Sequence, residues 1–289
     1  MPYFCMDVRA RTRSWATRRR VVVGGGALAM ALAAVAVAAA VGTAPAGSAA
    51  PPGPVAPPPC ERRTFEGTAF TICTLDTQRG ELRLASRGKA GMPLRSFAAL
   101  SHEMGDDSRR VAFAMNAGMF DAAGAPIGLL ISAGATLHAL DTGDGSGNFY
   151  LKPNGVLSVD RDGTIHVEPT AAYAARHPDP AWATQSGPML VIDGAIHPAI
   201  APDGSSRTIR NGVGARDAHT ALFAISEAPV SFGRFARLFR DELHCTSALY
   251  LDGAVSSVWI PSANRRDADH ALGPLAVILA PPSPTPTGR

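Results

Sequence analysis

The sequence predicts one α+β domain with mixed, largely antiparallel sheets and a few packed helices. Short segments that alternate apolar and polar residues, typical of half-buried strands, outnumber the segments with helical spacing. The strands follow one another through turn residues rather than alternating regularly with helices, which favours α+β over a βαβ architecture. Residues 60–281 contain no internal repeat and no second linker, so we expect them to form a single domain.

The first pair of strands is expected at residues 68–75 and 81–85. Both segments alternate apolar and polar residues, and Gln78-Arg79-Gly80 lies between them. Turn residues between two alternating segments are typical of a hairpin. We therefore predict that these two strands pair with each other.

A second hairpin is predicted from residues 155–159 and 164–167. The Asp162-Gly163 pair precedes the second strand, and such a pair tolerates the positive φ angles of a tight turn. Two later strands are expected at residues 220–225 and 275–279, where apolar residues dominate.

Two helices are expected. Residues 94–104 carry apolar residues at helical spacing. Residues 232–243 show the stronger pattern, an apolar stripe with the charged residues away from it, and Ser231 precedes them as a candidate N-cap. We expect this stripe to pack on the core rather than to bind a partner.

The N-terminus has the pattern of an export signal or a membrane anchor. Six arginines within residues 1–20 precede an uncharged stretch that opens with the apolar residues 21–41 and ends in small residues near residue 50. The arginines also fit a twin-arginine signal loosely. The apolar run reaches the length of about 20 residues that spans a bilayer, so membrane anchoring stays open beside cleavage. Either way, we expect an exported protein that is periplasmic, extracellular or anchored facing outward.

The charge and the ends of the chain fit this division. Residues 1–50 hold six of the 27 basic residues and one of the 24 acidic residues, so the remainder carries 21 basic and 23 acidic residues. With no basic stripe there, we expect no nucleic-acid partner. Residues 51–59 are rich in proline and predict a stiff linker. Residues 282–289 predict a disordered tail.

The cysteines are few. Cys60 and Cys73 flank a hydrophobic segment and can form a bridge in an oxidising compartment. Cys245 is then left over, and its place before an apolar run indicates a buried free thiol rather than a catalytic one. Because paired C-x-x-C spacing is missing, the sequence predicts no zinc site.

The sequence lacks the motifs of several common classes of enzyme. It has no G-x-S-x-G nucleophile elbow, no P-loop, and no second histidine at the zinc-protease spacing after His102. The glycine-rich segment 141–148 lacks the spacing of a calcium loop. We therefore expect no metal and no cofactor.

Four segments indicate a composite site, because each joins short apolar stretches to glycine and polar residues. They begin at Asn116, Gln185, Arg210 and Asp252. This is the pattern of buried strands that deliver side chains to a site at their ends. We expect the four segments to converge on one pocket.

With these segments in view, the chain resembles the phosphodiester glycosidase family, and in particular its bacterial exported branch. The resemblance runs from about residue 110 to residue 279. It rests on the order and spacing of short motifs, namely Asn116-Ala117-Gly118-Met119-Phe120, Pro126-Ile127-Gly128-Leu129, residues 148–155, Gln185-Ser186-Gly187-Pro188, residues 210–214 and Leu251-Asp252-Gly253. After this Asp-Gly pair the family usually has a second glycine, where this chain has Ala254. If that position needs a positive φ angle, alanine costs about 1 kcal/mol or more.

The resemblance implies cleavage of a sugar-1-phosphodiester, with Asp252 and Arg210 as the catalytic residues. A carboxylate must activate water or attack the sugar, and a guanidinium matches the oxygens of the departing phosphate. The alternatives are an aspartate that caps its own turn and an arginine held in a structural salt bridge. Residues expected to bind substrate are Asn116, Gln185, Ser186, Gly214 and Ser256. Further candidates are the carboxylates Asp121 and Asp217 and the imidazoles His219 and His244.

Two functions follow from these observations. The first is an exported glycosidase that hydrolyses a sugar-1-phosphodiester in a glycan or cell-envelope polymer, with a carbohydrate or sugar phosphate as its partner. The second is a non-catalytic factor that binds polysaccharide or assists exopolysaccharide assembly on the same scaffold. Arg210 and Asp252 favour the first.

Overall fold

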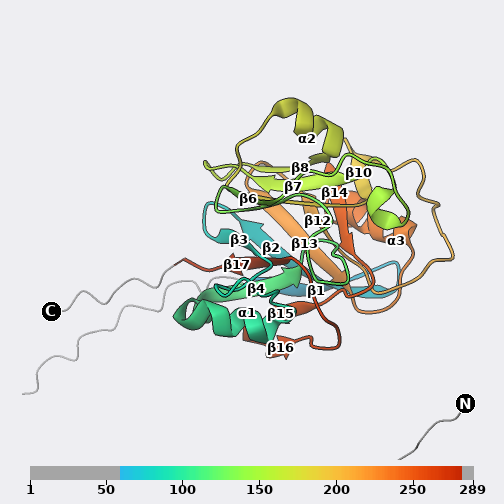
Figure 1. Ribbon diagram of the computed structural model, residues 1–289. Coiled ribbons are helices and arrows are strands. Elements are labelled where there is room, and N and C mark those ends of the chain that lie inside the picture. The colour runs from blue at the N-terminus through green and yellow to red at the C-terminus, as the bar shows by residue number, and fades with distance from the viewer. Residues whose placement is uncertain (1–58, 282–289) are drawn as a thin grey trace, which may run out of the picture. The chain divides into compact units, whose positions relative to one another are not determined.

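The computed structural model describes residues 59–281, which form three antiparallel sheets around a shared core (Figure 1). Residues 1–58 and 282–289 lie outside the described part. They contain the expected signal or anchor, nearly all of the expected linker, and the expected tail. Within residues 59–281, no helix is both long enough and apolar enough to cross a membrane. The α+β class predicted from the sequence is confirmed.

The first sheet has seven strands and supplies the main wall of the core. In spatial order they are β1 (Cys60–Phe65), β2 (Thr68–Asp76), β13 (Thr220–Ser226), β12 (Asn211–Ala215), β14 (Ser247–Asp252), β10 (Met189–Ile192) and β11 (Ala195–Ile196).

The two smaller sheets have five strands each. The second contains β16 (Arg265–Arg266), β15 (Val258–Ile260), β4 (Val111–Asn116), β17 (Leu275–Leu279) and β3 (Glu81–Ala85). The third contains β6 (Ala135–His138), β5 (Leu130–Ser132), β9 (Trp182–Ser186), β7 (Gly155–Val159) and β8 (Ile165–Pro169).

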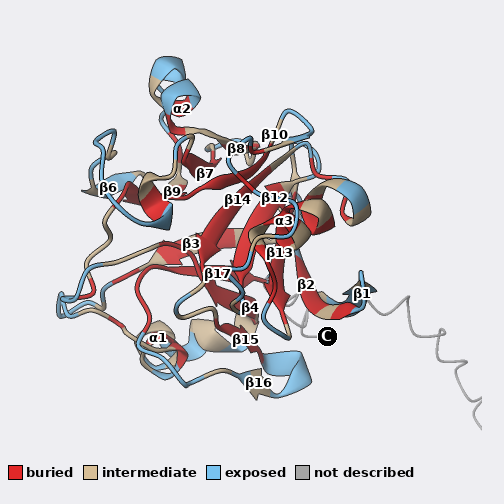
Figure 2. Cartoon of the chain, turned by 90° about the vertical axis from the view of Figure 1, so that its right-hand side faces the viewer, coloured by how far each residue is buried: buried red, intermediate tan, exposed pale blue. Residues whose placement is uncertain are grey.

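The strands are buried because the sheets and helices cover them in layers. Phe113, Leu157 and Phe223, one from each sheet, belong to the same buried cluster. The outer face of the first sheet packs on α3 (Phe232–Arg237), and that of the second packs on α1 (Phe97–Met104). Figure 2 shows the buried strands at the centre and the exposed surface on α2 (Thr170–Arg176) and the loops.

The two expected helices are present with shifted ends. The N-cap of α1 is Ser96, whose side chain accepts a hydrogen bond from the Ala99 N–H, because Arg95 has a left-handed φ of 58° and cannot continue a helix. The N-cap of α3 is Ser231, as expected, and the helix continues as a π-helical turn at Leu238–Glu242.

The prediction that residues 68–75 and 81–85 pair as a hairpin is wrong, although both strands exist. β2 pairs with β1 and β13, whereas β3 pairs with β17 in another sheet. The chain leaves the first sheet at Thr77, whose N–H donates to the His219 carbonyl, and turns where the Gly80 N–H donates to Asp76. The hairpin of β7 with β8 is confirmed, with Gly163 at a φ of 86°.

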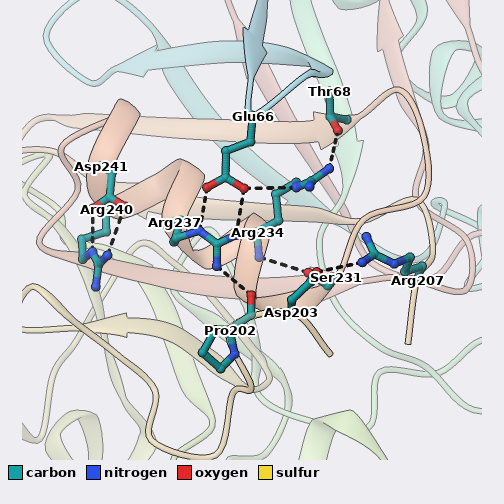
Figure 3. Close-up of polar contacts among 10 residues, drawn as sticks. All are labelled: Glu66, Thr68, Pro202, Asp203, Arg207, Ser231, Arg234, Arg237, Arg240 and Asp241. Carbon is teal, nitrogen blue, oxygen red and sulfur yellow. Dashed lines mark hydrogen bonds and ion pairs between the residues drawn. The ribbon is translucent and has the colours of Figure 1, made fainter. Parts of the chain in front are cut away.

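The partner of β2 is the hairpin strand β1, joined to it by Glu66 and Gly67. Both residues have positive φ angles, 44° and 73°, as a tight hairpin turn requires. The Glu66 carboxylate accepts hydrogen bonds from Arg234 and Arg237 of α3 (Figure 3). These contacts hold the tip of the hairpin against the helix.

The predicted disulfide is present. Cys60 and Cys73 are directly opposite each other on β1 and β2, and their sulfur atoms are bonded. The remaining described cysteine, Cys245, is a buried free thiol, and burial raises its pKa to about 12. The thiol is therefore protonated at neutral pH and poorly nucleophilic.

We expect the disulfide to stabilise the fold by about 3 kcal/mol, because it closes a short loop in the unfolded chain. The double variant Cys60→Ala, Cys73→Ala should unfold at a lower urea concentration with a similar m-value. Cys245→Ala serves as the control for loss of a cysteine outside the bridge. A double variant as stable as the unmodified protein would contradict this expectation.

Candidate active site

The turn that follows Asp252 joins two of the sheets. It runs from the end of β14 in the first sheet to the start of β15 in the second. Asn211, at the start of β12, is opposite Asp252 in the strand pairing. Asn116 ends the neighbouring β4. Strand ends that are far apart in the sequence therefore meet at this turn.

Asp252 is buried and has its two carboxylate oxygens in different environments. The residue is 5% exposed. Oδ1 accepts hydrogen bonds from the backbone N–H groups of Gly253 at 2.6 Å, Ala254 at 2.7 Å and Val255 at 3.4 Å. Oδ2 has no hydrogen-bond partner among the described residues. The aspartate thus caps its own turn and still keeps one oxygen free for chemistry.

The environment of Asp252 favours the protonated form more than water does. Burial raises the pKa of the carboxyl group, while the three backbone donors and the charge of His270 act in the opposite direction. The net shift is upward. A carboxylate with a raised pKa is a better proton acceptor than an ordinary surface aspartate.

Asp252 faces a cavity of about 290 Å³, which we call the Phe120 cavity. Its lining comes from three connections between strands. Met119, Phe120 and Ile127 lie between β4 and β5, Asn148 lies between β6 and β7, and the turn at the end of β14 supplies Asp252, Gly253, Ala254 and Val255. Besides the Asp252 motif, the lining includes residues of three other motifs of the family resemblance, at residues 116–120, 126–129 and 148–155. The wall is mainly apolar, with one carboxylate and one amide.

Asn116 and Asn211 hold the turn in place from behind. The Asn116 Oδ1 accepts from the Ser257 N–H at 2.8 Å and from the Asn211 Nδ2 at 3.1 Å. Ser256 Oγ lies 3.2 Å from Asn211 Oδ1 and 3.1 Å from the Asp252 carbonyl oxygen. Among the described residues, Asn116 Nδ2 is a buried donor without a partner. These contacts tie the first and second sheets to the Asp252 turn.

Arg210 lies at the same end of the first sheet, but its guanidinium is enclosed by protein. It is 1% exposed and stacks on the Phe232 ring, with its Cζ 3.6 Å from the ring centroid. Nε donates to the Val230 carbonyl, Nη1 to the Tyr250 hydroxyl, and Nη2 to Ser206. No ion pair to a carboxylate is found for it in residues 59–281. These contacts match the expectation of a structural arginine. Carbonyl and hydroxyl groups of the protein hold its guanidinium, in place of the expected salt bridge.

The contacts of Arg210 lead back to the Asp252 turn through Tyr250. Burial raises the pKa of the Tyr250 phenol to about 12, so it remains a neutral hydroxyl. A Cβ placed on Gly253 would come within 1.7 Å of that hydroxyl, so only glycine fits beside it. Arg210 thus positions Tyr250, and Tyr250 packs directly beneath the turn.

The other expected binding residues are framework contacts in this structure. All four hydrogen-bond positions of the Gln185 amide are occupied, by Leu129, Asp141 and Thr170. Ser186 Oγ donates to the Leu251 carbonyl at 2.9 Å, which links β9 to β14. Gly214 faces the π-helical turn after α3, and a Cβ there would lie 2.7 Å from the side chains of Phe239 and Cys245. None of these three lines the Phe120 cavity.

Ala254 adopts the turn without strain. Its φ angle is not positive, so the residue lies outside the left-handed conformation. Alanine at this position therefore does not carry the energetic cost expected for a residue with a positive φ angle. The Ala254 side chain is exposed and lines the Phe120 cavity.

A second cavity of about 330 Å³ lies beside the same turn, and we call it the His270 cavity. Gly253 and Ala254 line it together with Ser256, Ser257, Ile209, Ile225, Ser226, Glu227, Arg265, Asp267, Asp269 and His270. Sequence reasoning missed His270, because an isolated histidine in a polar segment carries no signal. The histidines proposed from the sequence, His219 and His244, line neither cavity.

Within residues 59–281, no group of three or more histidine, cysteine, aspartate or glutamate side chains is arranged to hold a metal ion.

The model of the family described as phosphodiester glycosidase matches residues 109–276. This chain belongs to the phosphodiester glycosidase family. The match covers all of the residues that line the Phe120 cavity and the His270 cavity. The resemblance seen in the motifs is therefore confirmed.

Two known proteins are similar to this phosphodiester glycosidase family member, one in sequence and one in fold. An uncharacterized protein from Escherichia coli, YigE, is 38% identical over 151 residues, which are 52% of this chain and 59% of that protein. The catalytic domain of zebrafish N-acetylglucosamine-1-phosphodiester alpha-N-acetylglucosaminidase, solved in a form auto-inhibited by its pro-peptide, has a similar fold. Its TM-score is 0.55 and its identity 13%, over 77% of this chain and 82% of that one.

Proposed function

We propose that the protein is an exported glycosidase that hydrolyses a sugar-1-phosphodiester linkage in a glycan or cell-envelope polymer. The observation that carries the proposal is the Phe120 cavity, whose described lining contains one carboxylate, Asp252, with one oxygen free. Ordinary glycosides need a second carboxyl group to protonate the leaving oxygen. Phosphate leaves readily without a proton, so a site with a single carboxylate fits a glycosyl phosphodiester better.

In the proposed reaction, the sugar occupies the Phe120 cavity with an apolar face against Met119 and Phe120. Asp252 Oδ2 either takes a proton from the attacking water or attacks the anomeric carbon itself. The bond from that carbon to the phosphate oxygen breaks, and the phosphate departs with the bonding electrons. If Asp252 attacks, water then hydrolyses the glycosyl ester, which releases the sugar and restores the carboxylate. The backbone donors to Oδ1 keep the carboxylate oriented while this happens.

Arg210 supports this reaction from beneath the turn. Its positive charge is buried and has no carboxylate partner within the described chain, so little nearby charge cancels it. Burial lowers the pKa of Arg210, but arginine remains protonated at neutral pH. A fixed charge in a poorly solvated region stabilises developing negative charge more strongly than the same charge in water. We propose this indirect role in place of direct phosphate binding.

Hydrolysis of defined substrates tests the proposal. The full-length protein should release N-acetylglucosamine from the methyl diester of N-acetylglucosamine 1-phosphate, measured by product chromatography. The methyl glycoside of the same sugar should react at least about 10²-fold more slowly, because its leaving group needs a general acid. Saturable binding of polysaccharide with no turnover of any diester would favour the binding or assembly factor instead.

Export is part of the same proposal. It rests on the arginine-rich and apolar pattern of residues 1–50, and the Cys60–Cys73 bridge supports an oxidising compartment. Cell fractionation checks it. Recovery of the full-length protein from the cytoplasm with both thiols free would contradict it.

A further inference from the structure

The Asp252 turn is a partition between two cavities. Gly253 and Ala254 line both the Phe120 cavity and the His270 cavity. Each cavity alone is at the lower limit of about 300 Å³ for small-molecule sites, whereas the two together fall well inside the usual range. A ligand larger than one sugar would need both.

The two cavities differ in chemistry. The Phe120 cavity offers apolar side chains and an aromatic ring, which suit the apolar face of a sugar. The His270 cavity offers hydroxyl, carboxyl and imidazole groups, which suit a ligand rich in hydroxyls. Its charged side chains comprise three carboxylates, on Glu227, Asp267 and Asp269, against the one guanidinium of Arg265. This excess of negative charge disfavours a second phosphate there.

The charged side chains that line the His270 cavity fall into two groups, one held by hydrogen bonds within the protein and one without such contacts. Arg265 donates to Glu227 at 2.6 Å and to Asp267 at 3.0 Å, and Asp267 also accepts from the Val258 N–H. For Asp269 and His270 no hydrogen bond or ion pair is found with any residue in 59–281. Both side chains are exposed at the cavity, so they are available to a ligand.

We propose, on the basis of the function given above, that the substrate spans the turn and that the His270 cavity recognises its leaving group. The sugar that is released lies in the Phe120 cavity. The phosphate crosses the turn at Ala254, and an uncharged, hydroxyl-rich aglycone such as a second sugar lies against Asp269 and His270. Ala254 is then the residue that decides how large an aglycone the turn admits.

Two diesters of N-acetylglucosamine 1-phosphate test the proposal, one with a methyl and one with a glucosyl aglycone. In the full-length protein the glucosyl diester should have the lower KM. His270→Ala should raise the KM of the glucosyl diester about tenfold more than that of the methyl diester, because methyl does not reach the second cavity. A change in kcat through the pKa of Asp252 would affect both diesters alike, so the ratio of the two KM values is the readout. His244→Ala, an exposed histidine away from both cavities, should change neither.

Ala254→Leu gives a second, independent readout. The φ angle at this position is not in the left-handed region and leucine keeps the backbone N–H, so the variant should fold. A larger side chain at the partition should lower kcat/KM for the glucosyl diester at least about tenfold more than for the methyl diester. Calorimetric binding of both diesters to Asp252→Asn protein separates recognition from turnover.

The outcomes distinguish this proposal from the function on which it rests. If the methyl diester is hydrolysed but the glucosyl diester binds no better, and His270→Ala affects both alike, the leaving-group site is overturned and the function stands. If neither diester is bound or hydrolysed, both are overturned. A glucosyl preference that is lost in His270→Ala and in Ala254→Leu supports both.

Discussion

The variant Asp252→Asn should lose at least about 10²-fold in kcat while remaining as stable as the unmodified protein or becoming more stable. Activity falls because an amide can neither accept a proton nor attack the sugar, and general acid–base groups contribute about 10² to 10⁴-fold. Stability persists because the amide oxygen can still accept the backbone hydrogen bonds that now reach Oδ1. Steady-state kinetics and urea denaturation measure the two effects.

The dependence on pH follows from the raised pKa of Asp252. In the unmodified protein, kcat/KM should fall as the pH drops through this pKa, which lies above the ordinary value of 3.8. For stability the sign is opposite. A raised pKa in the folded state contributes stability at low pH that is lost as the pH rises through it. The advantage of Asp252→Asn should therefore be present at neutral pH and disappear in acid.

Two further variants make this prediction specific. Asp252→Ala removes the acceptor of the backbone donors and should cost about 1–3 kcal/mol of stability in addition to activity. Asp217→Asn is the matched control, because Asp217 also accepts a hydrogen bond within its own turn, from the His219 N–H, but lies away from both cavities. Full activity in a folded Asp252→Asn protein would move the chemistry to another residue.

Replacement of Arg210 by lysine should destabilise the fold by at least about 3 kcal/mol. Lysine keeps the charge but lacks the planar group that reaches Val230, Tyr250 and Ser206 together. Each buried partner left without a hydrogen bond costs about 1–3 kcal/mol. Chemical denaturation gives the change in the free energy of unfolding.

The matched control for this prediction is Arg240→Lys. Arg240 is paired with its exposed neighbour Asp241, so its replacement should change stability by less than about 0.5 kcal/mol. Tyr250→Phe should reproduce part of the Arg210→Lys effect, because it removes the hydroxyl between Arg210 and the Asp252 turn. An Arg210→Lys protein of normal stability, with a penalty on phosphodiesters alone, would instead indicate direct phosphate binding.

The sequence by itself determined the elements that depend on local pattern. The alternating strands, the Asp162-Gly163 hairpin and the Ser231 cap are present because each follows from turn geometry and burial within a few residues. Of the four segments expected on one pocket, those that begin at Asn116 and Asp252 line the Phe120 cavity, because buried strands that end in polar residues place those residues at an edge of the sheet. Gln185 and Arg210 do not line it. The family motifs reinforced the same segments.

Only the tertiary structure decided the partners of these elements. Alternation shows that one face of β2 is buried, but not whether β2 pairs with β3 or, as it does, with β1 and β13. The sequence also could not separate a buried arginine from one that binds a ligand. Two of the four hydrogen bonds that the Arg210 guanidinium donates go to backbone carbonyls, and any residue type can supply a carbonyl. His270 reaches the Asp252 turn because the chain folds back after β16, which no local pattern encodes.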